Sequence, residues 1–242
     1  MSSTAITFRI LPGMTPAALG FIKEAVGPRG AEHDESRRRL GITREKAWIE
    51  NTNEGDVLVF FFEGGDLKAA MSMLGESDNM YDLWFREKMF TLTGADLCDL
   101  RQVKPSELIF EAQVDTPGGG AASTAVVLHI LPGETGEMSQ LVEQLAGPRA
   151  EEYRDMLQRH GLERSRMYLQ RRPSGETVVL YAEGRDPGAS IAGFARSSQP
   201  FDAWLREMML KVNGTDFIRR QTAPPPHLLL DWKASEAGSK AA

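Results

Sequence analysis

Four side chains that could move a proton occupy alternating positions in expected strands of the second half of the chain: His129, Tyr181, Glu183 and Asp231. A histidine oriented by one carboxylate acts as a general acid or base near neutral pH. We therefore predict these four side chains as a catalytic group. A histidine with two carboxylates could also hold a divalent metal, but we expect no metal here. The competing interpretation is a set of ion pairs at a solvated rim of the sheet.

A second set of aromatic and charged side chains is expected to bind a ligand. His33 and Arg29 come from a kinked helix that could reach a pocket between helices and sheet, and Tyr153 and Arg149 hold the equivalent positions of the second half. The competing interpretation is structural. The Gly-Pro-Arg motif at 27–29 and 147–149 would then fix the helix kink, and Trp84 would pack in the core. The remaining members of the predicted ligand-binding set are Arg9, Trp48, Glu50, Trp84 and Tyr168.

The sequence lacks the short motifs of several enzyme classes: no GxGxxG follows a strand, and GxxxxGK[ST], HExxH and GxSxG are absent. The single cysteine, Cys98, excludes an internal disulfide and a Cys-rich metal site. A net charge of −6 argues against a nucleic-acid partner, which needs clustered Lys and Arg. No apolar run approaches membrane-spanning length and the start does not resemble a signal peptide. We expect a cytoplasmic protein with no membrane partner.

The chain is an internal duplication. Residues 5–112 align with residues 125–232 at a constant offset of 120, without a gap and with 29 identities in 108 positions. Both copies carry ILPG, GPR, an EG-x-D turn and a D-x-W-x-R-E-x-M segment. A register kept for so long is the signature of repeated structural units.

Each copy contains the same succession of elements. In the first strand, for example, Ile6, Phe8 and Ile10 alternate with polar residues. Glycine and proline then separate the elements. In the first copy we predict strands at 5–11, 46–52, 57–63 and 107–113, a kinked helix at 16–26 and 28–40, and a broken helical region at 67–75 and 79–93.

The order βαββαβ favours a ferredoxin-like sheet with the spatial strand order 4-1-3-2 and both helical regions on one face. The other face must also be covered, and two copies can cover each other. We therefore predict an α+β fold of two tandem ferredoxin-like βαββαβ repeats, packed sheet to sheet as a pseudo-dimeric α+β barrel. In this order His129 would lie between Asp231 and Glu183, and Arg9 would lie between two glutamates.

The tandem arrangement and the segments at 77–97 and 197–217 resemble the dimeric α+β barrel superfamily, and more closely an uncharacterised bacterial family of small single-domain members. The resemblance implies a small-molecule-binding barrel, with a cofactor-independent enzyme of secondary metabolism (cyclase, isomerase or monooxygenase-like) as one option. The alternatives are a non-catalytic ligand-binding or structural barrel, and a haem protein. We expect no cofactor, because the helices at 79–93 and 199–213 lack the histidine that haem-using members of the superfamily generally carry.

The predicted organisation has four parts. The first repeat covers 1–113, a Gly/Pro-rich linker covers 114–123, the second repeat covers 124–233 and a disordered tail covers 234–242. If the repeats pair within one chain, a monomer with an internal pseudo-dimer results, and if they pair between chains, a homodimer results.

Overall fold

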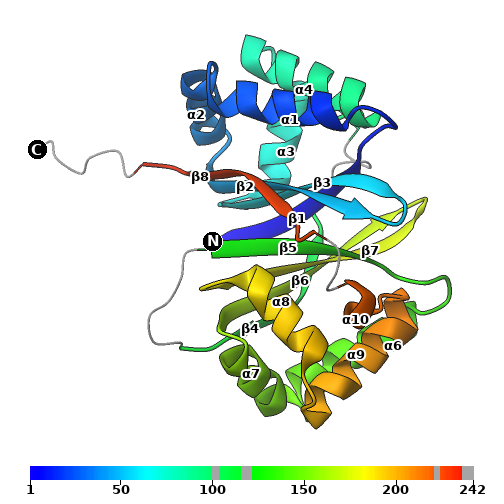
Figure 1. Ribbon diagram of the computed structural model, residues 1–242. Coiled ribbons are helices and arrows are strands. Elements are labelled where there is room, and N and C mark those ends of the chain that lie inside the picture. Colours follow the sequence, from blue (N-terminus) through cyan, green and yellow to red (C-terminus); the bar gives the residue numbers. More distant parts are fainter. Residues whose placement is uncertain (100–103, 116–121, 221–223, 236–242) are drawn as a thin grey trace, which may run out of the picture. The chain divides into compact units, whose positions relative to one another are not determined.

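A computed structural model describes residues 1–99, 104–115, 122–220 and 224–235. The fold is α+β and duplicated, as predicted, with two ferredoxin-like units in tandem. The first unit comprises residues 1–105 and 227–242, and the second unit comprises residues 106–226. In each unit a four-stranded antiparallel sheet carries its helices on one face (Figure 1).

The first unit follows the predicted order of elements, with boundaries within a few residues of those read from the sequence. Gly94, with a φ of 73°, ends the last helix where the sequence places a stop, because glycine enters the left-handed region without a steric penalty. The elements are β1 (Ser2–Arg9), α1 (Thr15–Val26), α2 (Gly30–Arg39), β2 (Ile42–Thr52), β3 (Gly55–Gly64), α3 (Leu67–Glu76), α4 (Met80–Thr93) and, from the end of the chain, β8 (His227–Lys233).

The second unit repeats this pattern. Gly214, with a φ of 65°, ends its long helix in the same way as Gly94 does in the first unit. The elements are β4 (Glu107–Gln113), β5 (Ala122–His129), α6 (Thr135–Ala146), α7 (Ala150–Arg159), β6 (Leu162–Arg172), β7 (Gly175–Gly184), α8 (Pro187–Arg196), α9 (Pro200–Asn213) and α10 (Phe217–Arg220).

The predicted strand order is wrong in one respect. The sheets run β1-β3-β2-β8 and β4-β6-β7-β5, so the last strand of each repeat does not lie beside the first strand. It lies at the opposite edge, paired with the second strand of the other repeat. Opposite charges face each other across both of these pairings, with Arg166 2.7 Å from Glu111 and Lys46 3.1 Å from Asp231.

The exchange of last strands also changes the predicted boundaries. The repeats at 1–113 and 124–233 are units of sequence, whereas each compact unit takes its fourth strand from the other repeat. Most of the predicted linker, residues 116–121, lies outside the described residues, as do residues 236–242 of the predicted tail.

The hydrophobic cores lie between helices and sheet, on the strand faces that the alternation predicts. In the first unit the helix-facing side chains include Phe8, Ala47 and Phe60, and all are buried. Trp48 and Phe61 point to the opposite face and are also buried, each 0% exposed. Both faces of this sheet therefore lie away from solvent at these strands.

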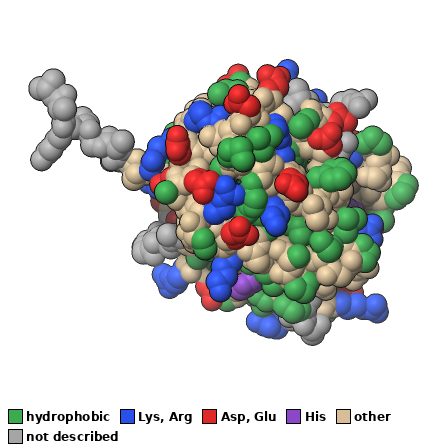
Figure 2. Space-filling model, turned by 90° about the horizontal axis from the view of Figure 1, so that it is seen from above, with side chains coloured by type: hydrophobic (Ala, Val, Ile, Leu, Met, Phe, Trp, Pro, Cys, Tyr) green, Lys and Arg blue, Asp and Glu red, His purple; other side chains and the backbone are tan. Residues whose placement is uncertain are grey.

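The surface mixes charged and apolar side chains. In the view of Figure 2, acidic, basic and hydrophobic side chains intermingle on one face of the molecule. Within the described residues, no helix has the length and apolar character to cross a membrane.

Candidate functional site

Within the second unit, the pairing of β5 with β7 separates His129 from Glu183, another member of the predicted catalytic group. His129, at the end of β5, is paired with Thr177 and its Nδ1 lies 3.2 Å from the Thr177 hydroxyl. Glu183 lies six residues further along β7, where it accepts a 2.5 Å hydrogen bond from Tyr181. Asp231 belongs to the first unit. The prediction that the last strand would bring a carboxylate beside His129 is therefore wrong.

Asp231 and Arg9 have other partners than those predicted. Asp231 lies 3.1 Å from Lys46 and 3.9 Å from Arg44. Arg9, expected between two glutamates, is exposed and donates to the carbonyl oxygen of Glu54 at 2.5 Å.

Arg29 and its counterpart Arg149 lie at the helix kink, where each contacts a glutamate and two aromatic rings. Arg29 donates to Glu32 at 3.0 Å and its guanidinium lies over the rings of Trp84 and Tyr81, at 4.2 and 5.1 Å from their centroids. Arg149 repeats these contacts in the second unit. Trp84 also packs against Phe21 at 5.2 Å between centroids, in agreement with the core interpretation of this residue.

His33 belongs to a buried trio of ionisable side chains that the sequence did not reveal. Its Nε2 lies 2.9 Å from Glu45, and Arg37 donates to the same carboxylate at 2.5 Å. All three side chains are at most 2% exposed. Burial alone would raise the pKa of Glu45, but Arg37 and His33 lower it to about 2. The trio is a buried ionic cluster in which Arg37 compensates the charge of Glu45.

The remaining predicted ligand-binding residues are buried strand side chains. Trp48 and Tyr168 are each 0% exposed, and Glu50 is 1% exposed. They lie on the face opposite the helices, as the alternation predicts. Their role in binding stays a prediction.

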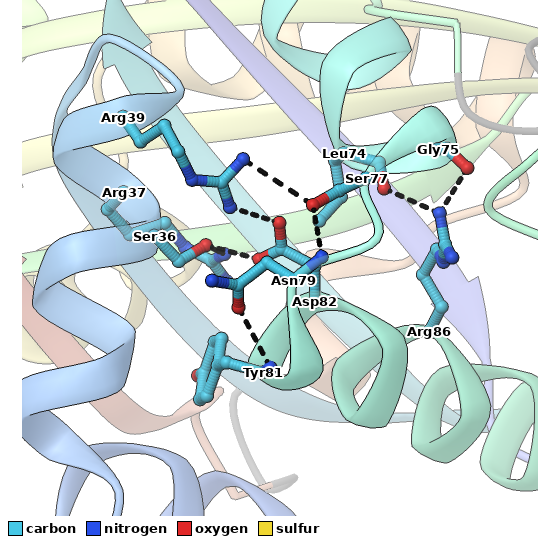
Figure 3. Close-up of polar contacts among 10 residues, drawn as sticks. All are labelled: Ser36, Arg37, Arg39, Leu74, Gly75, Ser77, Asn79, Tyr81, Asp82 and Arg86. Carbon is cyan, nitrogen blue, oxygen red and sulfur yellow. Dashed lines mark hydrogen bonds and ion pairs between the residues drawn. The ribbon is translucent and has the colours of Figure 1, made fainter.

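In the first unit, the buried Asp82 of α4 connects α4 to residues of the α2 region (Figure 3). Asp82 accepts a 2.6 Å hydrogen bond from Ser36 and forms an ion pair with Arg39. Arg86, four residues after Asp82, bonds instead to the carbonyl oxygens of Leu74 and Gly75. The spacing of Asp82 and Arg86 is that of a surface helix pair, but the two side chains bond to different partners.

The second unit contains a cavity between its helices and sheet, which we call the helix–sheet cavity. It has a volume of about 60 Å³, against about 30 Å³ for the corresponding space in the first unit. A water molecule needs roughly 10–15 Å³ on such a measure. Apolar side chains dominate its lining, which consists of Thr124, Val126, Tyr153, Met156, Leu157, His160, Leu162, Ser165, Met167, Leu180, Ala182, Pro187, Ser190, Ile191, Phe194, Leu205, Met209 and Phe217.

The duplication explains why this cavity is larger. Phe60 and Phe62 fill the first unit at the positions that Leu180 and Ala182 occupy in the second. Phe8 and Phe85 are likewise matched by leucines at 128 and 205. Phenylalanines at 194 and 217, in place of leucines, restore part of this volume.

The trio of the first unit also has a smaller, neutral counterpart at the cavity. His33, Arg37 and Glu45 correspond to Tyr153, Leu157 and Ser165. The Tyr153 hydroxyl lies 2.7 Å from the Ser165 hydroxyl, and burial raises the pKa of Tyr153 to about 12. This tyrosine is therefore a neutral hydrogen-bonding group.

One hydroxyl at the cavity is left without a partner. Thr124 on β5 is 5% exposed, and its Oγ1 makes no hydrogen bond to any described residue. Its neighbour across the sheet is Ala182, where the first unit has the ring of Phe62. Burying an unsatisfied hydroxyl costs about 1–3 kcal/mol, so a group that bonds to Thr124 would recover that cost.

A histidine–aspartate pair also borders the cavity. His160 Nε2 lies 2.9 Å from Asp202, and Arg159 donates to the other carboxylate oxygen at 2.7 Å. The side chain of His160 is only 12% exposed, because the residue directly follows α7 and its ring bonds to Asp202 of α9. Comparison of the copies could have found it, since the equivalent residue is Leu40.

No protein-family model matches the chain, and no curated protein matches its sequence. Three solved structures are similar in fold. A putative monooxygenase from Fusobacterium nucleatum has a TM-score of 0.48 and 10% identity, over 96% of this chain and 93% of that one. An anthrone oxidase-like protein has a TM-score of 0.44 and 14% identity, over 99% and 96%. An uncharacterised ferredoxin-fold protein from Listeria monocytogenes, related to antibiotic biosynthesis monooxygenases, has a TM-score of 0.35 and 10% identity, over 94% and 92%.

Proposed function

We propose that the second unit binds a small, uncharged and largely apolar molecule in the helix–sheet cavity. The observation that carries this proposal is the loss of aromatic volume at 180 and 182 relative to 60 and 62. Empty volume in a protein core costs stability, and the first unit shows that this backbone arrangement accommodates phenylalanine at both positions. A ligand would supply the missing contacts.

The lining supports an uncharged ligand. None of the side chains that line the cavity is a lysine, arginine, aspartate or glutamate. A charged group brought there would lose its hydration without gaining an ion-pair partner. The lining also contains Met156, Met167 and Met209, whose unbranched side chains adjust readily to different ligand shapes.

A catalytic role is a further part of this proposal. A cofactor-independent enzyme of cyclase, isomerase or monooxygenase-like type needs a group that can accept or deliver a proton beside its substrate. The histidine–aspartate pair at the cavity is the described feature that supports such chemistry. A purely structural core is the competing interpretation.

The proposal can be tested with a hydrocarbon probe and a variant that restores aromatic volume. Ethylbenzene should raise the unfolding temperature of the wild-type protein and shift the NMR signals of methyl groups around the cavity, because a ligand that binds only the folded state stabilises it. Ala182→Phe places at 182 the residue found at 62 and should abolish both effects. Ala182→Leu, a smaller filling, should reduce them.

A matched control adds the same ring elsewhere. Ala189→Phe places a phenylalanine on an exposed position of α8, outside the cavity lining, and should leave ethylbenzene binding unchanged. If ethylbenzene neither stabilises the wild-type protein nor shifts its methyl signals, the proposed binding is wrong and the cavity is a packing feature only.

A further inference from the structure

We infer that His160, held by Asp202, selects the ligand of the helix–sheet cavity by accepting a hydrogen bond from it. The ligand is then an apolar molecule with a hydroxyl group, rather than a pure hydrocarbon. This inference rests on the proposed function, and it adds the chemical class of the ligand and the residue that distinguishes it.

Asp202 fixes which histidine nitrogen carries the proton. Its side chain is 0% exposed. Burial raises the pKa of Asp202, but hydrogen bonds from Ser197, His160 and Arg159 outweigh that effect and lower it. An ionised carboxylate can only accept hydrogen bonds, so Nε2 of His160 donates to Asp202. In the neutral ring, Nδ1 then keeps its lone pair and is an acceptor.

The Nδ1 atom of His160 is not used by the described part of the protein. No hydrogen bond links it to a described residue, whereas the backbone oxygen of His160 accepts a 2.6 Å bond from Ser190. It faces Gly193 on α8, where an added Cβ would stand 3.1 Å from Nδ1. A side chain at 193 would therefore crowd this acceptor, whereas the ring of His160 itself belongs to the cavity lining.

The two copies differ at both positions together. In the first unit Leu40 stands in place of His160 and Met73 in place of Gly193. There Asp82 receives its hydrogen bond from Ser36 of α2 instead. In the second unit a donor to Asp202 is thus a ring that borders the cavity, and glycine stands where a Cβ would crowd that ring.

An alcohol is the ligand that these surroundings suit. A hydroxyl donates to Nδ1, and the unsatisfied Thr124 hydroxyl offers a second polar contact on the lining. A carboxylate would present no donor to Nδ1, and an ammonium group would lack a carboxylate on the lining.

The test compares two probes with the same ring and the same number of heavy atoms, benzyl alcohol and ethylbenzene. Their dissociation constants are measured by NMR titration, and the ratio between them isolates the hydroxyl from the rest of the contact. In His160→Leu, which introduces the residue found at position 40, the affinity for benzyl alcohol relative to ethylbenzene should fall about tenfold, the value of one hydrogen bond. A structural role alone would change both affinities together.

A second variant keeps the histidine. Gly193→Ala should place its methyl group against Nδ1 and produce a similar loss of relative benzyl alcohol affinity, while α8 tolerates alanine well. Leu40→Val, a change confined to the first unit, serves as the control and should leave the ratio unchanged.

The outcomes separate the two proposals. If ethylbenzene binds but the ratio changes by less than about twofold in both variants, against the hydrogen-bond value expected, the role of His160 is refuted and the proposed binding stands. If neither probe binds the wild-type protein, the proposed function fails and this inference fails with it.

Discussion

Replacing Glu45 with glutamine should lower the free energy of unfolding of the first unit by about 3–5 kcal/mol. Arg37 is only 1% exposed and donates to Glu45 at 2.5 Å, so the substitution leaves a buried guanidinium without its counter-charge. Breaking a buried pair by removing one partner is costly for this reason. His33 loses its carboxylate partner at the same time.

The pH dependence of stability gives a second value for the contribution of Glu45 to the free energy of unfolding. The pKa of Glu45 falls from an ordinary value of 4.5 to about 2 in the folded protein. At about 1.4 kcal/mol per pKa unit, this difference corresponds to about 3 kcal/mol. Because the folded pKa is the lower one, this stability is fully present above pH 4.5 and is lost as the pH falls toward 2. The Glu45→Gln variant should lack that part of the acid dependence.

The assay is urea unfolding, followed by tryptophan fluorescence at a series of pH values between 2 and 8. A control variant replaces the trio with the equivalent residues of the second unit. A triple variant, His33→Tyr, Arg37→Leu and Glu45→Ser, takes the residues found at 153, 157 and 165. It should recover most of the stability lost by Glu45→Gln at pH 7, because no buried charge remains. The reasoning is refuted if Glu45→Gln costs less than about 1 kcal/mol at pH 7, against the several expected for a broken buried pair, or if the triple variant is as unstable as the single one.

Three further outcomes follow from the same structure. Thr124→Val should raise the free energy of unfolding of the ligand-free protein by about 1 kcal/mol, since it removes an unsatisfied hydroxyl; equal or lower stability in urea would contradict this. Phe62→Ala should destabilise the first unit by about 3–5 kcal/mol in the same assay, because it empties a packed core position; a loss below 1 kcal/mol would show that the site collapses. Deletion of residues 227–242 should increase hydrogen–deuterium exchange of β2 (Ile42–Thr52) while the amides of β6 (Leu162–Arg172) keep their protection, because β8 pairs with β2 alone; equal protection of β2 with and without the deletion would refute that pairing.

Much of the fold could be predicted from the sequence because its determinants are local or periodic. The constant offset of 120 residues established the duplication, and the alternation in strands such as Ile6, Phe8 and Ile10 assigned the helix-facing side chains. Glycine in the left-handed conformation at 94 and 214 ends the long helices where the sequence placed their stops.

The partner of the last strand could not be predicted, for a reason that the duplication itself supplies. Glu111 and Asp231 occupy equivalent positions, as do Lys46 and Arg166. Opposite charges would therefore meet whichever copy supplied the fourth strand. Since local pattern and charge are the same for both pairings, only the tertiary structure distinguishes them.

The candidate site was likewise only partly predictable from the sequence. From the sequence alone, His129 is predicted as a catalytic residue and His33 as a ligand-binding residue. The structure places His33 in a buried ionic cluster and pairs His129 with Thr177 rather than Glu183, while it brings His160 and Thr124 to one cavity.

The sequence by itself determined the repeated βαββαβ order, the faces of the strands and the positions at which the copies diverge, because these depend on spacing along one chain. Tertiary structure alone decided which strand edges pair, which charges are neutralised and where volume remains empty. Those properties depend on distances between side chains far apart in the sequence, and on how the aromatic rings of one copy fill a space that smaller residues leave open in the other.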